Sequence, residues 1–398
     1  MFSNSPNGVL ENIYGNLWLL EAVDVNMEVR EQFRTLLSKR HEVAGKWKGR
    51  GKRVVGWSCT YTPEEIIYAA DILPVRILGS SESLTLADAY CPDNMCSFCR
   101  SCFDGALKGD YAYLDGFVAS NSCDNREKMY DLWRHHVTIP YFHFINTPHS
   151  NTKKAHDFFY DELVRFKGSL EKTFGRPISD QSLRKAVEVY NENRTLLKEI
   201  YDLRKKDPPL ISGVEALDMV LSSMVAPKDE HNRLLTQFLR GISNKSSQPK
   251  RGVRLLVSGS VMDTGDLLKI VEACGGSVVA DDLSTGSRYF WDEVDSNAKP
   301  LHAIASRYLS KVPCPFTYQS ENRFRHVMDM AKGYDVDGAL IIVLKFCDPH
   351  LFDAPLLKEA LESSGLPVLY LEVEHALSGV AQLRTRMEAF IEMIRGVS

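Results

Sequence analysis

The segment Arg53-Val-Val-Gly-Trp-Ser58 is a short apolar run that ends at small and polar residues, and Pro63–Ala70 and Pro74-Val-Arg-Ile-Leu78 follow it. The first and third of these segments predict β-strands, and the second, which opens with a proline, predicts a helix. Two strands with a helix between them are the repeating unit of a parallel α/β sheet. This stretch therefore indicates the fold class.

The same alternation continues along the chain on both sides of a charged central region. Further helices are predicted at 97–108 and 126–134, and further strands at 116–119 and 140–144. A second series predicts strands at 253–257, 277–280, 338–344 and 367–371 and helices at 266–274, 299–308, 322–332, 355–363 and 382–394. The predicted fold is α/β, with two open Rossmann-like parallel-sheet domains.

Helical segments precede and separate these two sheets. Residues 16–23 and 29–39 carry apolar side chains at helical spacing, and residues 155–171 and 180–205 predict long, charged amphipathic helices. The polar, proline-containing stretch 243–250 is typical of a domain boundary. The predicted domains are a helical N-terminal segment at 1–50, an α/β domain at 51–150, a helical region at 151–248 and a second α/β domain at 249–398.

Composition narrows the class of protein. The chain has 398 residues, 44% of them hydrophobic and 25% charged, with a formal net charge of -4 at pH 7. This is a globular composition, and the negative balance argues against a dedicated nucleic-acid-binding protein. Residues 1–20 lack a basic segment followed by an apolar one, and no segment is long and apolar enough to span a bilayer. We therefore expect a cytoplasmic protein with neither nucleic acid nor membrane as a partner.

Cysteines are the most informative residues for function. Four of the nine lie in Cys91-Pro-Asp-Asn-Met-Cys96-Ser-Phe-Cys99-Arg-Ser-Cys102. In a reducing compartment this density indicates metal binding rather than disulfides. Cys123 and Cys347 follow two predicted strands, at the sheet edge where α/β proteins present their ligands. Thiols from both α/β domains could meet there, which favours an iron-sulfur cluster over a zinc ribbon, since no second Cys-x2-Cys pair exists.

Five separated motifs resemble the family of 2-hydroxyacyl-CoA dehydratase and benzoyl-CoA reductase subunits. In chain order they are 56–64, 96–102, 115–126, Lys345-Phe-Cys-Asp-Pro349 and Gln382-Leu-Arg-Thr-Arg386. The resemblance runs from about residue 50 to the C-terminus. Two more segments, 281–290 and 307–315, resemble the benzoyl-CoA reductase and double-cubane branch more than the dehydratases.

The resemblance implies that Cys96, Cys123 and Cys347 bind one [4Fe-4S] cluster. It implies a subunit of a benzoyl-CoA reductase type enzyme, which reduces an aromatic acyl-CoA thioester by one electron at a time. It further implies a homologous partner subunit and a separate ATP-hydrolysing iron-sulfur activator, and this chain has no Gly-x4-Gly-Lys phosphate loop of its own. The alternatives are an electron-relay subunit, a 2-hydroxyacyl-CoA dehydratase subunit, and a homodimeric reductase of small molecules with a double-cubane [8Fe-9S] cluster.

Each remaining candidate residue could have a purely structural role instead of a functional one. Five more thiols could be further cluster ligands or could simply pack in the protein core: Cys59, Cys91, Cys99, Cys102 and Cys314. Cys274 is predicted to be a buried residue at a helix end. Arginines that could bind CoA phosphates, or form caps and salt bridges, are Arg100, Arg126, Arg384 and Arg386. Side chains that could wall an aryl pocket, or fill the core, are Tyr289, Phe290 and Trp291. No catalytic proton donor is assigned.

Overall fold

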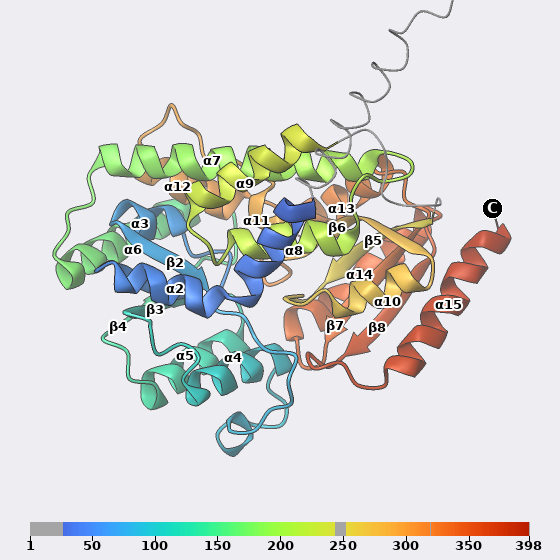
Figure 1. Ribbon diagram of the computed structural model, residues 1–398, viewed down its shortest axis with the longest axis horizontal. Coiled ribbons are helices and arrows are strands. Elements are labelled where there is room, and N and C mark those ends of the chain that lie inside the picture. The colour runs from blue at the N-terminus through green and yellow to red at the C-terminus, as the bar shows by residue number, and fades with distance from the viewer. Residues whose placement is uncertain (1–26, 243–251, 319, 398) are drawn as a thin grey trace, which may run out of the picture.

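A computed structural model describes residues 27–242, 252–318 and 320–397 (Figure 1). Within them, two four-stranded sheets have the strand orders β2-β1-β3-β4 and β6-β5-β7-β8. Every neighbouring pair is parallel; Val55 of β1 pairs with Gly116 of β3, and Val257 of β5 with Leu340 of β7. The strands are β1 (Arg53–Trp57), β2 (Ile72–Arg76), β3 (Gly116–Ser120), β4 (Tyr141–Ile145), β5 (Val253–Gly259), β6 (Gly276–Asp282), β7 (Gly338–Leu344) and β8 (Val368–Val373).

Helices connect the strands and cover the sheets, and residues 27–38 are helical as well. Every residue of β2, β3, β5 and β7 is buried, as expected of parallel strands that are covered on both faces. The helices are α2 (Arg40–Gly49), α3 (Glu64–Ala69), η1 (Ala87–Ala89), α4 (Ser97–Lys108), α5 (Asp124–His136), α6 (Lys153–Phe174), α7 (Asp180–Asp202), η2 (Leu203–Lys205), α8 (Gly213–Ser223), α9 (Lys228–Gly241), α10 (Asp266–Ala273), α11 (Ser287–Phe290), α12 (Pro300–Ser310), α13 (Glu321–Gly333), α14 (Asp348–Ser363) and α15 (Val380–Val397).

The predicted α/β fold with two parallel sheets is confirmed, and each predicted strand is present. One helix start is wrong: the helix predicted at 355–363 begins at Asp348, with Pro349 in its first turn and Pro355 inside it. A proline fits the first turn because its missing N–H has no helical partner there, so Pro349 marks the start and Pro355 does not. The helix predicted at 16–23 and the boundary predicted at 243–250 lie outside the described residues, and the domain limits stay a prediction.

The two sheets share one hydrophobic core. A single cluster of buried side chains contains Trp57 and Phe117 from the first sheet and Leu255 and Ile341 from the second. Helix α7 runs along both halves and packs on α3 and on α12 (Figure 1). Its serine N-cap, Ser179, accepts a hydrogen bond from the Ser182 N–H at 3.1 Å, which fixes where this long helix begins.

A buried ion pair also ties the halves together, close to the first cysteine-rich segment. His375, which follows β8, lies 2.6 Å from the carboxylate of Asp263, which follows β5. The Gly79 N–H donates to Asp263 at 2.7 Å, and the His375 N–H donates to the Ser97 hydroxyl at 3.0 Å. Burial alone would lower the pKa of His375, but the Asp263 carboxylate raises it above its usual value. The loops at the ends of β5 and β8 are thereby fixed against the first half of the chain.

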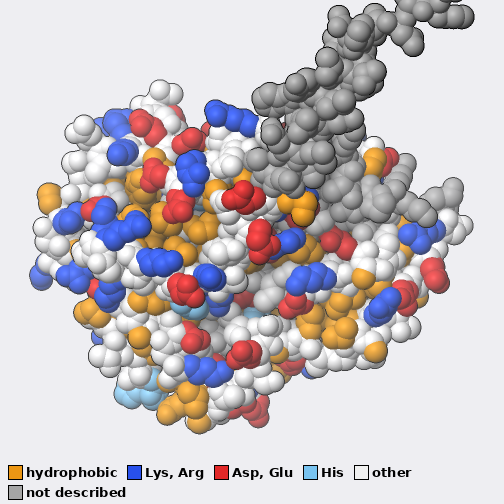
Figure 2. All heavy atoms as spheres, in the orientation of Figure 1, with side chains coloured by type: hydrophobic (Ala, Val, Ile, Leu, Met, Phe, Trp, Pro, Cys, Tyr) orange, Lys and Arg blue, Asp and Glu red, His pale blue; other side chains and the backbone are white. Residues whose placement is uncertain are grey.

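The surface carries charges of both signs. Figure 2 shows lysine and arginine side chains interspersed with aspartate and glutamate on one face. Among the helices of the described ranges, none combines the length and the apolar character needed to cross a membrane.

Gly259 sets a close approach between the central strands of the second sheet. It has a φ of 145°, and an added Cβ would lie 1.8 Å from the carbonyl oxygen of Ile342. Gly259→Ala should therefore lower the free energy of unfolding by about 2 to 3 kcal/mol, through backbone strain and steric overlap. Anaerobic urea unfolding followed by circular dichroism measures the change. Gly168→Ala is the matched control, because a Cβ there meets nothing within 4 Å inside α6, and it should leave stability equal or slightly higher.

Candidate functional site

Cys96, Cys123 and Cys347 share one structural position. Each is the N-cap residue of a helix, respectively α4, α5 and α14, and none of the three uses its side chain as a cap. The first N–H groups of a helix lack intrahelical partners and carry a positive partial charge. Helix N-termini consequently bind anions well. Thiolates placed at these three positions, and any negatively charged group that they hold, are favoured by the helices that follow.

The three thiols lie together although they are far apart in sequence. Cys96 and Cys347 are close enough for their side chains to hydrogen-bond, and Cys123 interacts electrostatically with both. Burial, with the neighbouring Cys347 thiol, raises the pKa of Cys123 despite the opposing charge of Arg126. Protonated thiols are therefore expected at neutral pH unless a metal cation replaces the protons. The predicted convergence of thiols from both halves of the chain is confirmed.

Asn125 fixes the positions of the three cysteine segments relative to one another. It is buried, one residue into α5, and its side-chain oxygen accepts a hydrogen bond from the Cys96 N–H at 2.9 Å. Its amide nitrogen donates to the carbonyl oxygen of Phe346 at 3.0 Å. Phe346 takes a left-handed φ of 61°, which turns the chain directly before Cys347. Sequence reasoning did not single out Asn125; the available signal was a side chain that both donates and accepts, two residues after a candidate ligand.

The other thiols surround this group unevenly. Cys99 lies beside Cys96, one turn into α4, and Cys102 is fully buried on the same helix. Cys59 and Cys314 are within electrostatic reach of each other, and Cys59 also lies within reach of Arg126 and the Ser122 side chain. Cys91 lies among Arg100, Asp88 and Asp104 instead, away from the other thiols.

Cys274 caps the C-terminus of α10 but is only partly buried, so the burial predicted for it is wrong. In the ranges that the structure describes, no three His, Cys, Asp or Glu side chains are placed to bind one common metal ion. The ligands of an iron-sulfur cubane are held farther apart, because each binds a different iron.

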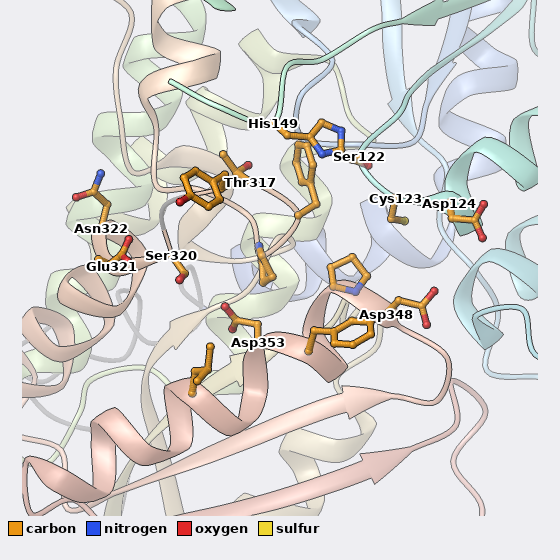
Figure 3. Close-up of a pocket in the computed structure, with 16 residues that line it drawn as sticks. Ser122, Cys123, Asp124, His149, Thr317, Ser320, Glu321, Asn322, Asp348 and Asp353 are labelled. Carbon is orange, nitrogen blue, oxygen red and sulfur yellow. The ribbon is translucent and has the colours of Figure 1, made fainter. Parts of the chain in front are cut away.

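A cleft of about 910 Å³ opens onto Cys123. One side is lined by Ser122–Asp124, and the other by the first turns of α14, which carry Asp348 and Asp353 (Figure 3). Residues 315–318 and 320–322 and His149 complete the lining. A group bound by Cys123 would be reached through this cleft.

The cleft is acidic. Exposed carboxylates at Asp124, Glu321 and Asp348 line it, of which Asp124 pairs with Lys128, and none of the described residues in its lining is a lysine or arginine. Two exposed aromatic side chains, Tyr318 and Phe352, also line it. A polyanion such as coenzyme A is repelled by carboxylates, and the described lining offers it no lysine or arginine of its own.

The arginines predicted for CoA phosphates are placed differently from that expectation. Arg100 pairs with Asp88, Arg384 pairs with Glu388 at 2.8 Å, and Arg386 donates to the Tyr370 carbonyl at 2.8 Å. Arg126 is buried among the cysteines. None of the four lines the cleft.

Of the two alternatives left open for residues 289–291, an aryl pocket or the core, the structure supports the core for Tyr289 and Phe290. Tyr289 and Phe290 are buried. The Tyr289 ring stacks on that of Trp57 with centroids 6.2 Å apart, and the Phe290 ring meets Tyr201 edge-on at 4.7 Å. Trp291 packs against His326, and none of these three residues lines the cleft.

Residues 59–394 match the family of the 2-hydroxyglutaryl-CoA dehydratase D-component. The chain belongs to this family. The motifs at 56–64, 96–102 and 345–349 predicted that membership, and the match covers the cysteines at all three helix starts.

Relatives named as enzyme subunits align over nearly their whole length. The chain is 30% identical over 348 residues to the (R)-phenyllactyl-CoA dehydratase beta subunit of Clostridium sporogenes, covering 86% of this chain and 92% of that protein. It is 27% identical to the lactoyl-CoA dehydratase subunit beta of Anaerotignum propionicum, covering 86% and 92%. It is 24% identical to a subunit of the benzoyl-CoA reductase of Thauera aromatica, covering 88% and 94%. The chain is thus similar to enzyme subunits of both the dehydratase and the reductase type.

Replacing Asn125 should disturb the register that brings the cysteines of this family member together. Asn125→Ala removes the acceptor for the Cys96 N–H, in buried surroundings, and the donor to the Phe346 carbonyl, in partly buried surroundings. We expect the free energy of unfolding to fall by about 2 kcal/mol, measured by anaerobic urea unfolding. Asn322→Ala is the control, since Asn322 lies in the cleft near Cys123 but is exposed. Equal stability of the two variants would contradict the role given to Asn125.

Proposed function

We propose that this chain is the iron-sulfur subunit of an ATP-dependent, low-potential enzyme that acts on acyl-CoA thioesters. Cys96, Cys123 and Cys347 would bind one [4Fe-4S] cluster. The observation that carries the proposal is the meeting of these three thiols at the N-termini of α4, α5 and α14. The cluster would supply one-electron transfer.

The surroundings of the thiols fit such a group. Helix N-termini stabilise the negative charge of a thiolate-bound cluster. The Ser260 hydroxyl lies within hydrogen-bonding reach of Cys347 and accepts from the Leu344 N–H at 3.0 Å. Hydrogen bonds to cluster sulfurs and burial both tune the reduction potential. Asn125 holds the Cys96 backbone and the Phe346 carbonyl, so the ligand positions are preorganised.

We infer that this subunit delivers electrons rather than holding the CoA moiety. The cleft over Cys123 is acidic and, among the described residues, has no lysine or arginine in its lining, which suits a polyanionic substrate poorly. The relatives at 30% and 27% identity are named as beta subunits, which supports a homologous partner subunit as the one that holds the thioester. The absence of a phosphate-loop motif supports a separate ATP-hydrolysing activator.

Two reactions of the assembled enzyme are compatible with this role. Reduction of an aromatic acyl-CoA, of benzoyl-CoA reductase type, is supported by the segments 281–290 and 307–315 and by the relative at 24% identity. Radical dehydration of a 2-hydroxyacyl-CoA is the second candidate, and the higher identities to two dehydratase subunits favour it.

A double-cubane cluster remains an alternative that the set of thiols allows. Cys99 and Cys102 extend the group along α4, and the buried Cys59 and the partly buried Cys314 form a pair nearby. We place the single cubane first because it needs only the three thiols that meet at helix starts.

Loss of one helix-start thiol should remove the cluster. We expect Cys347→Ser to reduce iron from about four per chain to a small fraction of that, with loss of the sulfur-to-iron absorption in the visible range. Iron analysis and absorption spectra of anaerobically purified protein provide the measurement. Cys274→Ser is the control and should keep its iron, because Cys274 lies at the C-cap of α10, outside the cysteine group. Full iron and colour in Cys347→Ser would refute the ligand assignment, and about eight irons in the unmodified chain would establish the larger cluster.

The products of the assembled enzyme distinguish the two candidate reactions. With partner subunit, activator, ATP and a low-potential reductant present, the first candidate predicts ATP-coupled consumption of benzoyl-CoA without loss of water. Chromatography of the thioesters measures it, with (R)-phenyllactyl-CoA offered in parallel. If only the hydroxyacyl thioester reacts, by losing water, dehydration is the reaction and reduction of benzoyl-CoA is excluded.

A further inference from the structure

Two arginine side chains lie inside the protein beside the cysteines. Arg126 is 7% exposed and Arg76 is fully buried. Arg126 donates to the carbonyl oxygen of Ser58, and its guanidinium lies 5.5 Å from the centre of the Phe98 ring. Arg76 lies 4.7 Å from the centre of the Trp57 ring, and within the described part of the chain none of its three guanidinium nitrogens has a hydrogen-bond partner. Neither arginine forms an ion pair with a carboxylate of a described residue at salt-bridge distance.

Both positions follow from the elements that carry the thiols. Arg126 is in the first turn of α5, where its N–H donates to the Cys123 carbonyl at 3.0 Å. Phe98, beneath its guanidinium, is in the first turn of α4, just after Cys96. The charge of Arg126 therefore lies between the starts of α4 and α5.

Arg76 approaches the same region from the first sheet. It ends β2 and is the Cα partner of Trp57 on β1. It is within electrostatic reach of Arg126 and of the thiols of Cys59 and Cys102. Arg126 in turn reaches Cys59, Cys99, Cys102 and Cys123. Two buried cations thus face one group of thiols.

Such a pair of buried like charges is unfavourable without an anion. A buried, unpaired charge costs several kcal/mol, and two of the same sign repel each other. Burial lowers the pKa of Arg76 to about 10, which leaves it protonated at neutral pH. Glu64 is the carboxylate within its electrostatic reach, but burial raises the pKa of Glu64 and so disfavours its charged form. An additional negative charge among the thiols would balance the two guanidiniums.

We propose that Arg126 and Arg76 are positioning residues that stabilise the reduced cluster and thereby raise its reduction potential. This inference rests on the proposed iron-sulfur function. Reduction adds one electron to the cluster and removes nothing, so the site becomes more negative by one charge. Fixed cations in a buried, low-dielectric region stabilise that charge without any movement or proton uptake. The electron comes from an external low-potential donor, for which titanium(III) citrate substitutes in the test.

The test is a redox titration of the cluster-loaded chain, followed by electron paramagnetic resonance. Arg126→Gln should lower the equilibrium constant for reduction about tenfold, which is a midpoint about 59 mV more negative for a one-electron couple. Arg126→Lys keeps a charge and should shift less. Arg76→Gln should shift in the same direction as Arg126→Gln. Arg134→Gln, exposed on the same helix, is the matched control and should leave the midpoint unchanged.

The outcomes separate the inference from the function on which it rests. Four irons and an unchanged midpoint in both glutamine variants would overturn the inference alone. An equal shift in Arg126→Lys and Arg126→Gln would overturn it as well, because charge would not be the cause. Loss of iron from both glutamine variants would show that the guanidiniums keep the ligands in place rather than set the reduction potential, and would overturn the inference. Absence of iron from the unmodified chain would overturn both proposals.

Discussion

The start of a helix directly after a strand is the constraint on which the rest of this structure depends. In both sheets the central strands β3 and β7 end, the chain turns within three or four residues, and α5 and α14 begin at a cysteine. Parallel strands place such turns at one edge of the sheet. The third helix, α4, starts at Cys96 and arrives beside them because it packs against α5. Thiols far apart in sequence then meet where three sets of unpaired backbone N–H groups converge.

That arrangement is held by polar contacts rather than by the core alone. The amide of Asn125 links the start of α4 to the turn before Cys347, and the Asp263–His375 pair fixes Gly79 and Ser97 against the second sheet. On the second sheet, Arg323 bonds to Asp282 at the end of β6 and to Asp353 in α14. The side chains that make these contacts are buried, so each hydrogen bond that is lost leaves an unpaired polar group in the interior. Such contacts keep α14, and with it Cys347, in a single position.

The strands were predictable because parallel strands buried on both faces read as continuous apolar runs, as in Gly338–Leu344. The placement of Cys123 and Cys347 at strand ends followed from those runs. The start of α14 was not predictable in the same way, because Pro349 and Pro355 both satisfy the rule for a first helical turn and only the turn after β7 distinguishes them. The role of Asn125 was not predictable because it depends on two segments that meet only in space. Tyr289 and Phe290 could not be assigned to core or pocket, since an aromatic side chain fits either and the packing partners, Trp57 and Tyr201, lie far away in sequence.

The thiols have negative charges on their solvent side and positive charges on their interior side. Carboxylates of Asp124, Glu321 and Asp348 line the solvent side of the cleft, whereas the guanidiniums of Arg76 and Arg126 lie behind the cysteines. Water and salt screen the outer charges, while the inner charges act through a medium of low dielectric, so the inner pair has the larger effect on the thiols per charge. An anionic ligand arriving from solvent meets the repulsive side first. In the proposed iron-sulfur role, an added electron would instead be stabilised by the inner cations, so this asymmetry supports electron acceptance over binding of a polyanionic thioester.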